Sequence, residues 1–226
     1  MSDNEGLSKN VYFLYRPGLS VALILIGIAV FIWMLFSWTQ HGFVNQYDQP
    51  LMQTMMKDQT TSPPWLPVLA LWYSRLGNIG VGILAGILAI YWLFKHRPKH
   101  FYILLVCTLG AFALFMGVVF GFHRPRLHEV GLLSLLPLPS FPSGHVVIAV
   151  TIAAFLLWLY LPHVRSASGR AFYIILAILF VLAIGAARLY LGAHYLTDVI
   201  AGYGLGLAWI VAALWFSEWA FIRPRG

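Results

Sequence analysis

The chain has 226 residues, of which 61% are hydrophobic, 16% aromatic and only 9% charged, and its mean hydropathy is +0.82. So little polar material cannot cover a soluble globule, and the composition therefore indicates an integral membrane protein. The net charge of +7 does not indicate a nucleic-acid partner, because the basic residues follow the ends of apolar segments and form no basic patch interleaved with aromatic residues. The single cysteine, Cys107, lies inside an apolar segment, which excludes a disulfide framework and a cysteine metal site.

Six apolar segments near the length of a bilayer crossing follow one another along the chain. They run from Leu19 to Trp38, Ile79 to Phe94, Phe101 to Phe122, Val146 to Leu161, Phe172 to Ala187 and Tyr195 to Trp215. We predict an all-α fold, a polytopic bundle of six transmembrane helices in one domain from residue 19 to 217, with short tails at 1–18 and 218–226. The outer loop 39–78 contains WLPVLALWY (65–73), which is too short to cross and is predicted as a short interfacial or re-entrant helix.

The distribution of Lys and Arg predicts the orientation. Nine of the fourteen basic residues fall with the two tails and the loops KHRPKH and HVRSASGR on one side, which we expect to be cytoplasmic. The protein is thus predicted in the inner or plasma membrane. The other side, periplasmic or extracellular, keeps Lys57, Arg75, Arg124, Arg126 and Arg188.

Two glycine pairs have the spacing that allows close contact between membrane helices. Gly82 and Gly86 lie in the second span, and Gly202 and Gly206 lie in the sixth. We predict helix contacts at both pairs.

Three polar clusters fall at the same, outer, end of the predicted bundle: HRPRLHE (123–129), FPSGH (141–145) and ARLYLGAHYLTD (187–198). Each alone could be a headgroup anchor, a snorkelling residue or a helix cap. Ionisable groups at a membrane boundary are costly unless they are paired or used, so their convergence predicts an extracytoplasmic-side active site.

The last cluster has the spacing of a catalytic pair. His194 and Asp198 are four residues apart at the start of a helix, so they share one face. The carboxylate can fix the imidazole tautomer and leave the other nitrogen as a nucleophile or base. His145 can then supply the proton that a leaving group needs.

Other residues describe an anion site. Arg124 and Arg188 carry planar guanidinium groups suited to phosphate oxygens, and Ser143, Gly144 and His145 begin a helix whose amides favour anions. Gly144 would let the backbone approach the anion, and Ser143 would add a hydroxyl donor.

These residues closely resemble the type 2 phosphatidic acid phosphatase family, membrane lipid phosphatases related to vanadium haloperoxidases, over about residues 45–215. The family signatures are K-x6-RP, PSGH and SR-x5-H-x3-D. Arg124-Pro125 fit the end of the first signature, Pro142 to His145 fit the second, and Arg188, His194 and Asp198 fit the third.

The resemblance implies roles for the site residues. His194 would be the nucleophile that forms a phosphohistidine, Asp198 would orient it, and His145 would protonate the leaving oxygen. The phosphoryl oxygens would be held by Arg124, Arg188, Ser143 and Gly144. The resemblance implies no metal and no cofactor, and a membrane lipid phosphate as substrate.

The chain departs from the family pattern at two positions. Gly117 stands where the family has its lysine, and Ala187 stands where it has the serine before Arg188. His123, Arg126 or His128 could replace the missing positive charge.

We therefore expect a metal-independent lipid phosphatase. Its expected substrates are an isoprenyl diphosphate such as undecaprenyl diphosphate, or phosphatidic acid or phosphatidylglycerol phosphate. Two alternatives stay open: a lipid phosphotransferase using the same site, and a lipid-phosphate binding or transport protein whose catalysis is weakened at Gly117. The sequence does not predict the oligomeric state.

Overall fold

The structure of the chain is a computed structural model that describes residues 16–125 and 139–222. The regular structure of the described residues is helical. In chain order the α-helices are α2 (Pro17–Thr39), α3 (Asn45–Thr61), α4 (Trp65–Arg75), α5 (Val81–Phe94), α6 (Pro98–Gly121), α7 (Gly144–Tyr160), α8 (Ala167–Tyr190) and α9 (Leu196–Ser217). Leu76–Gly80 and Glu218–Ile222 form π-helical turns, and Leu161–His163 forms a 3₁₀ turn.

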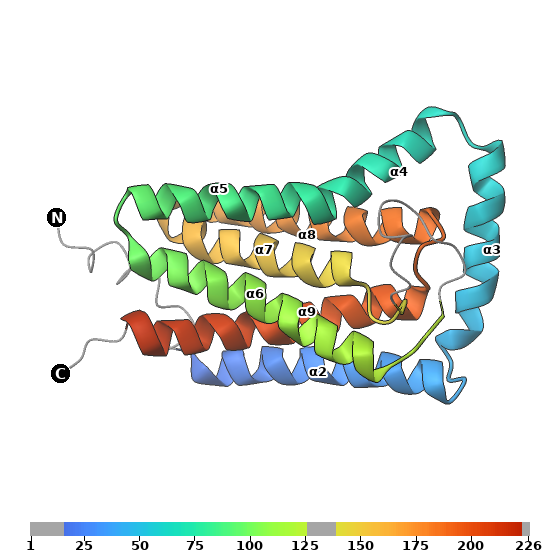
Figure 1. Cartoon of the computed structure of the whole chain (residues 1–226), viewed down its shortest axis with the longest axis horizontal. Helices are drawn as coiled ribbons and strands as arrows, with labels where there is room; N and C mark the ends of the chain where they lie inside the picture. The colour runs from blue at the N-terminus through green and yellow to red at the C-terminus, as the bar shows by residue number, and fades with distance from the viewer. Residues whose placement is uncertain (1–15, 126–138, 223–226) are drawn as a thin grey trace.

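Six of these helices run side by side along the long axis of the molecule (Figure 1). Five of them, α2, α6, α7, α8 and α9, are long and apolar enough to cross a membrane, and α5 is a shorter apolar helix. The predicted all-α polytopic membrane bundle is therefore confirmed, with α5 as the plausible sixth crossing.

The loop 39–78 contains more helix than the sequence predicted. α3 is a helix of 17 residues with little apolar content, and it lies across the end of the bundle where α7 and α9 begin (Figure 1). The stretch WLPVLALWY begins α4, which continues through the π-helical turn directly into α5. The apolar length missing from α5 is thus supplied by a helix that bends at the turn. Pro67 is compatible with α4 because it lies in the first turn, where its missing N–H costs no helical hydrogen bond.

The core is built around α9, which packs against α2, α6 and α7. A Cβ on Gly27 would lie 2.6 Å from the carbonyl oxygen of Gly204, so α2 and α9 cross at two glycines. A Cβ on Gly206 would lie 2.9 Å from the Val150 side chain, and one on Gly202 would lie 2.9 Å from the Ser143 carbonyl oxygen. The predicted contact of the second glycine pair is therefore made, between α9 and α7.

The first glycine pair makes no such contact. A Cβ on Gly82 or on Gly86 would have no neighbour within 4 Å among the described residues. The spacing alone therefore predicted the helix contact of α9 correctly and that of α5 wrongly.

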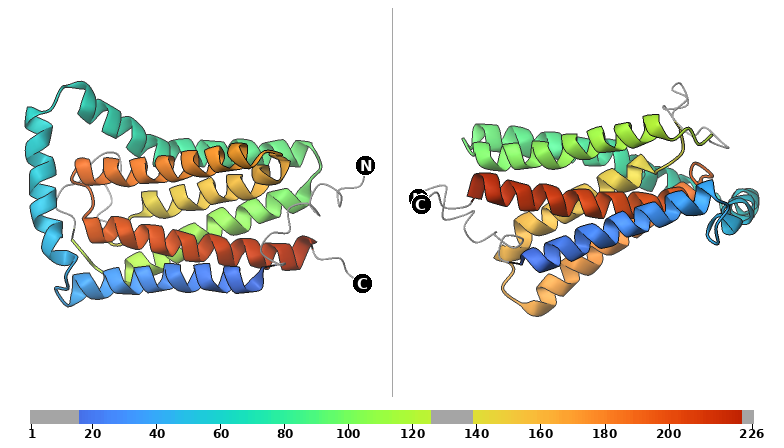
Figure 2. Two further views of the ribbon diagram at one scale, coloured as in Figure 1. Left: turned by 180° about the vertical axis from the view of Figure 1, so that it is seen from behind. Right: turned by 90° about the horizontal axis from the view of Figure 1, so that it is seen from below.

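The two ends of the bundle differ in charge. The start of α2, the α5–α6 turn, the α7–α8 connection and the end of the last π-helical turn lie at one end (Figure 2), and this basic end carries Lys95, Arg97, Arg165 and Arg170. The end covered by α3 carries Arg124, Arg188 and His194 of the polar clusters described above. We call it the site end.

Candidate active site

Six segments bring buried polar side chains together at the site end. They are α3, the end of α4, the extended residues after α6, the residues that lead into α7, the end of α8, and the turn 191–195 with the first turn of α9. The buried polar residues of this region are Asp48, Ser74, Arg124, Ser140, Ser143, Arg188, His194, Thr197 and Asp198. Among the predicted site residues only Gly144 and His145 are partly accessible. The structure therefore gathers the residues that the sequence spacing selected.

His194 is held by a backbone carbonyl as well as by a carboxylate. Its Nδ1 lies 2.9 Å from the carbonyl oxygen of Ser140 and 3.6 Å from Oδ2 of Asp198. A carbonyl oxygen can only accept, so Nδ1 carries the proton and Nε2 carries the lone pair. The hydrogen bond that puts the proton on Nδ1 is accepted by the carbonyl of Ser140, a residue that the sequence analysis did not select.

Asp198 does more than face the imidazole. Its Oδ2 accepts a hydrogen bond of 3.0 Å from the Tyr195 amide, which closes the first turn of α9, and its Oδ1 accepts one of 2.5 Å from Arg124. A carboxylate that is held on three sides has one orientation. Asp198 therefore closes the first turn of α9 and faces the His194 imidazole.

Arg124 lies in a buried network with two carboxylates. Its Nη1 donates to Asp198 and to the Thr197 hydroxyl (2.6 Å), while its Nη2 donates to Asp48 (2.8 Å). The guanidinium also stacks over the Tyr195 ring, 3.9 Å from its centroid. In this arrangement the guanidinium already has anionic partners, so its predicted contact with phosphate stays a prediction.

The start of α7 lies directly beside this network. The Ser143 amide donates to the backbone carbonyl of Asp198 (3.0 Å), which ties the N-cap residue of α7 to the first turn of α9. The Ser143 hydroxyl is buried and has no hydrogen-bond partner within the described part of the chain. The first turn of α7 lies next to it, and a helix N-terminus favours anions, so this hydroxyl is a suitable donor to an anion.

Gly144 has a packing reason that the sequence did not reveal. A Cβ at this position would lie 2.6 Å from the ring of Phe115 on α6. The absence of a side chain therefore allows α6 and α7 to pack closely here. This packing requirement is independent of the predicted approach of the backbone to an anion.

Arg188 and His145 complete the set. Nη1 of Arg188, in the last turn of α8, donates to the Ser74 hydroxyl of α4 at 2.6 Å. The His145 ring lies 6.5 Å, centroid to centroid, from the His194 ring. The two histidines are thus close enough to act on the same group.

Four residues of the site were missed in the sequence: Asp48, Ser74, Ser140 and Thr197. Asp48 accepts from the Thr197 amide (3.0 Å) and hydroxyl (2.6 Å) as well as from Arg124. A carboxylate in a polar loop gives no sequence signal for such burial, because the partners lie 76 and 149 positions away. Of these four residues, only Thr197 had a sequence signal, because it lies next to Asp198 in the first turn of a predicted helix.

The positions proposed to replace the family lysine are only partly described. Gly117 is exposed on α6, where Phe115 and Val119 face inward, and a Cβ on it would have no neighbour within 4 Å among described residues. His123 is exposed. Arg126 and His128 lie outside the described residues.

No group of three or more His, Cys, Asp or Glu that could hold a metal ion occurs in the ranges 16–125 and 139–222. The positive groups of the site are arginines and helix amides.

The chain matches known proteins in both sequence and fold. Residues 100–222 match the PAP2 superfamily. A stretch of 81 residues is 39% identical to phosphatidylglycerophosphatase B of Bacillus subtilis (strain 168), and this match covers 35% of the chain and only 39% of that protein.

Solved structures also resemble this chain in fold. The transmembrane PAP2-type phosphatidylglycerolphosphate phosphatase from Bacillus subtilis has a TM-score of 0.64 at 23% identity, covering 86% of this chain and 97% of that one. Aquifex aeolicus LpxE has a TM-score of 0.54 at 26% identity, covering 74% and 94%.

The fold and the comparisons together define a multi-pass membrane protein with the fold of the solved PAP2-type phosphatase. More particularly, the chain belongs to the PAP2 superfamily, and the resemblance seen in its signatures is confirmed.

Proposed function

We propose that the protein hydrolyses a phosphomonoester or diphosphate of a membrane lipid through a phosphohistidine on His194. The observation that carries the proposal is the hydrogen bond from His194 Nδ1 to the Ser140 carbonyl, because it puts the lone pair on Nε2. That nitrogen belongs to a buried side chain beside His145 and the start of α7.

In the first step Nε2 of His194 attacks phosphorus and the bond from phosphorus to the lipid oxygen breaks. His145 gives a proton to that oxygen, and the alcohol or lipid phosphate leaves. In the second step His145 takes a proton from water, the water oxygen attacks phosphorus, and the N–P bond breaks to release inorganic phosphate. Asp198 and the Ser140 carbonyl hold the ring while it is positively charged.

The phosphoryl oxygens would be held by Arg188, the Ser143 hydroxyl and the amides at Gly144 and His145. Arg124 remains a proposed phosphate ligand that would have to exchange a carboxylate partner for phosphate. These donors supply the positive charge that the transition state needs, so we propose that hydrolysis requires no metal ion.

The proposed substrates are undecaprenyl diphosphate or another isoprenyl diphosphate, phosphatidic acid, and phosphatidylglycerol phosphate. The name of the Bacillus relative, phosphatidylglycerophosphatase B, favours phosphatidylglycerol phosphate as the first lipid to assay. By the distribution of basic residues, we propose that the site end faces away from the cytoplasm in the inner or plasma membrane.

The test is phosphate release from these three lipids by detergent-purified protein in the presence of EDTA. We expect release by the native protein and none by His194→Ala. His41→Asn is the matched control, because His41 is an exposed histidine near the same end with a φ of 53°, which asparagine tolerates. Turnover by His194→Ala would overturn the assignment, and loss of release in EDTA would overturn metal independence.

The two alternatives give different results in the same assay. A phosphotransferase would release phosphate only when an acceptor lipid is supplied. A binding or transport protein would bind the lipids and release nothing.

A further inference from the structure

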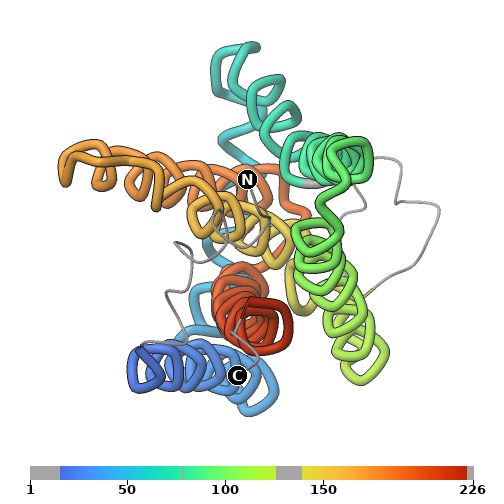
Figure 3. Tube along the Cα trace, turned by 90° about the vertical axis from the view of Figure 1, so that its left-hand side faces the viewer, coloured from blue at the N-terminus to red at the C-terminus, as the bar shows by residue number. Residues whose placement is uncertain are grey.

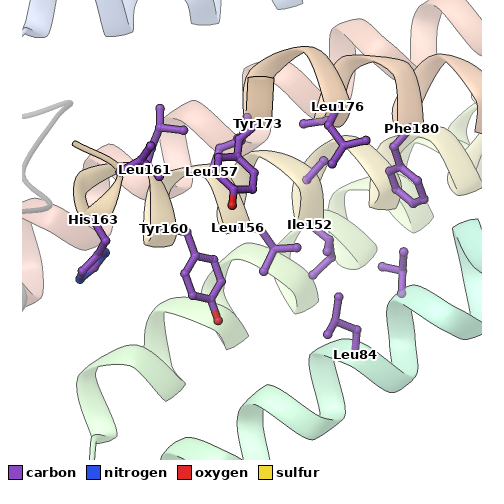
Figure 4. A pocket seen from close by; sticks show the side chains of 14 residues that line it. Leu84, Ile152, Leu156, Leu157, Tyr160, Leu161, His163, Tyr173, Leu176 and Phe180 are labelled. Atoms are coloured by element: carbon purple, nitrogen blue, oxygen red, sulfur yellow. The ribbon is translucent and has the colours of Figure 1, made fainter. Parts of the chain in front are cut away.

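A groove of about 810 Å³ opens between α5, α7 and α8, away from the site end. Its lining is almost wholly apolar, and Figure 4 shows Leu84, Ile152, Leu156 and Phe180 among the side chains that line it. The volume is within the range of pockets that hold small organic ligands. The catalytic proposal uses none of these residues.

The groove is closed toward the site end and open toward the basic end. A Cβ on Gly77 would lie 2.7 Å from the Ile184 side chain, so the helix that leads into α5 packs tightly on α8 there. From that contact toward the basic end, which faces the viewer in Figure 3, α8 diverges from α5. The groove therefore does not continue into the active site.

Polar groups gather where the groove reaches the basic end. Tyr160, His163 and Tyr173 line it there (Figure 4). Arg170 is exposed, and its Nε donates to the carbonyl of Val164, which also lines the groove, at 2.8 Å. The guanidinium is thus fixed at the rim.

We propose that this groove binds an anionic phospholipid of the leaflet at the basic end, with one acyl chain between α7 and α8 and its phosphate at Arg170. From Ile152 to Leu161 the groove follows α7 for about 13 Å at the helical rise of ~1.5 Å per residue, close to the depth of one leaflet. An apolar slot with a basic rim between membrane helices is complementary to such a lipid. The proposal goes beyond the catalytic function and does not depend on it.

The test compares thermal unfolding of the purified protein with phosphatidylglycerol and with phosphatidylcholine, which has no net charge. We expect phosphatidylglycerol to raise the unfolding temperature more, and Arg170→Gln to remove the difference. Lys95→Gln is the control, because it removes an exposed positive charge at the same end without touching the groove lining.

A second pair of variants tests the groove itself. Ala177→Trp fills it from α8 and should abolish the preference, whereas Ile178→Trp, at the next and outward-facing position, should keep it. Equal stabilisation by both lipids, or a preference that survives Arg170→Gln and Ala177→Trp, would overturn the proposal. So would a lipid-independent dimer in light scattering that Ala177→Trp dissociates, because the groove would then hold a second copy.

A separate observation concerns Asp48, and from it we infer a positioning residue for the reaction; this inference rests on the proposed function. Asp48 lies on α3, outside the residues 100–222 that match the family, and is 1% exposed. It binds the second amide of α9, at Thr197, and holds the far side of Arg124.

The network gives Asp48 a route to His194. Arg124 is fixed between Asp48 and Oδ1 of Asp198, which leaves Oδ2 of Asp198 directed at the Tyr195 amide and the His194 ring. A carboxylate at the start of α9 also complements the positive end of that helix. Asp48 thus sets the first turn of α9 and, through it, the nucleophile.

The test is Asp48→Asn beside Asp58→Asn, an exposed carboxylate on the same helix. We expect kcat to fall at least tenfold with KM within about twofold for Asp48→Asn, partial rescue by Asp48→Glu, and no change for Asp58→Asn. Thr197→Val, which removes one of the contacts, should lower kcat in the same way if Asp48→Asn cannot be purified.

A lower unfolding temperature with native kcat would show a structural role alone and overturn the inference. Native turnover of His194→Ala would overturn the proposed function instead, so the two failures are distinguishable.

Discussion

At the scale of single residues, the two histidines of the site differ in burial and in hydrogen bonding. His194 is buried and hydrogen-bonded at Nδ1, whereas His145 is partly accessible at the start of α7. A ring that is held in one tautomer suits a nucleophile, and a ring with access to water suits a group that exchanges protons. The difference in burial therefore supports the proposed division between nucleophile and acid.

His145→Ala should keep a nucleophile and lose the proton donor. We expect kcat to fall by about 10²–10⁴ with lipid substrates, because general acid catalysis contributes on that order. The fall should be much smaller for a phosphate ester whose leaving alcohol is acidic, such as nitrophenyl phosphate. An equal loss with both leaving groups would contradict the assignment of His145 as the acid.

Arg188→Lys tests whether the planar guanidinium matters. Arg188 donates to Ser74 through Nη1, so part of its fork is used to hold it against α4. A lysine keeps the charge but cannot both bind Ser74 and bridge phosphate oxygens, and we expect kcat/KM to fall by about 10²–10³. Kinetics measured beside Arg75→Lys, an exposed arginine of α4, give the control. Native kinetics for Arg188→Lys would show that charge alone suffices.

Gly117→Lys tests whether a lysine at the position of the family lysine can take part in the reaction. Because the residue lies on the outward side of α6 and its Cβ would meet open space, Gly117→Lys should fold and its amine should point away from the buried network. We expect turnover within about twofold of the native value. A rise of fivefold or more would show that the lysine reaches the site and that the position is catalytically vacant.

At the scale of elements, the turn between α8 and α9 carries His194, the proposed nucleophile. Gly192 has a φ of 65°, and its amide donates to the Leu189 carbonyl at 2.9 Å. The left-handed conformation lets the chain reverse within the few residues that separate Arg188 from His194. The spacing of the third signature therefore reflects a turn geometry as well as chemistry.

Gly192→Ala should strain this turn. A residue with a Cβ in the left-handed region costs about 1–2 kcal/mol, and we expect a loss of that size in the free energy of unfolding together with reduced kcat. Unfolding in denaturant measures the first, and phosphate release the second. Gly18→Ala, on the first turn of α2 with no neighbour within 4 Å of its Cβ among the described residues, is the control. Native stability of Gly192→Ala would contradict the strained turn.

The elements that the sequence predicted well are those fixed by composition. The long apolar segments became α2, α6, α7, α8 and α9 within a few residues of their predicted bounds. α3 was missed because its residues have low hydropathy, and its position depends on Asp48 finding partners in α9 and after α6. Burial of a polar side chain by distant partners leaves no local pattern.

At the scale of the whole molecule, the two ends of the bundle differ in the residues that they carry. The site end gathers buried carboxylates, arginines and histidines under α3, and the basic end carries the open groove. Residues of α3 share a small pocket with His194, including Met52 and Met55. The proposed lipid substrate would therefore reach the site past α3 or between the ends of the long helices.

The sequence predicted the family better than the architecture of the site. The four-residue spacing of His194 and Asp198 was enough to predict that they lie close together, but His194 lies in the turn before α9, so the two residues do not share a helix face. The hydrogen bond of His194 to Ser140, and the sharing of Arg124 by Asp48 and Asp198, depend on tertiary packing between segments far apart in the chain. The predicted role of Arg124 is the one that this packing most complicates.

The measurement that tests the central claim most directly is trapping of the covalent intermediate. Protein mixed with lipid substrate labelled at the transferred phosphate is quenched in alkali, which preserves a phosphoramidate, and the labelled peptide is sequenced. The account predicts alkali-stable, acid-labile label on His194 in the native protein and none in His194→Ala. Label on another residue, or steady turnover by His194→Ala, would contradict it.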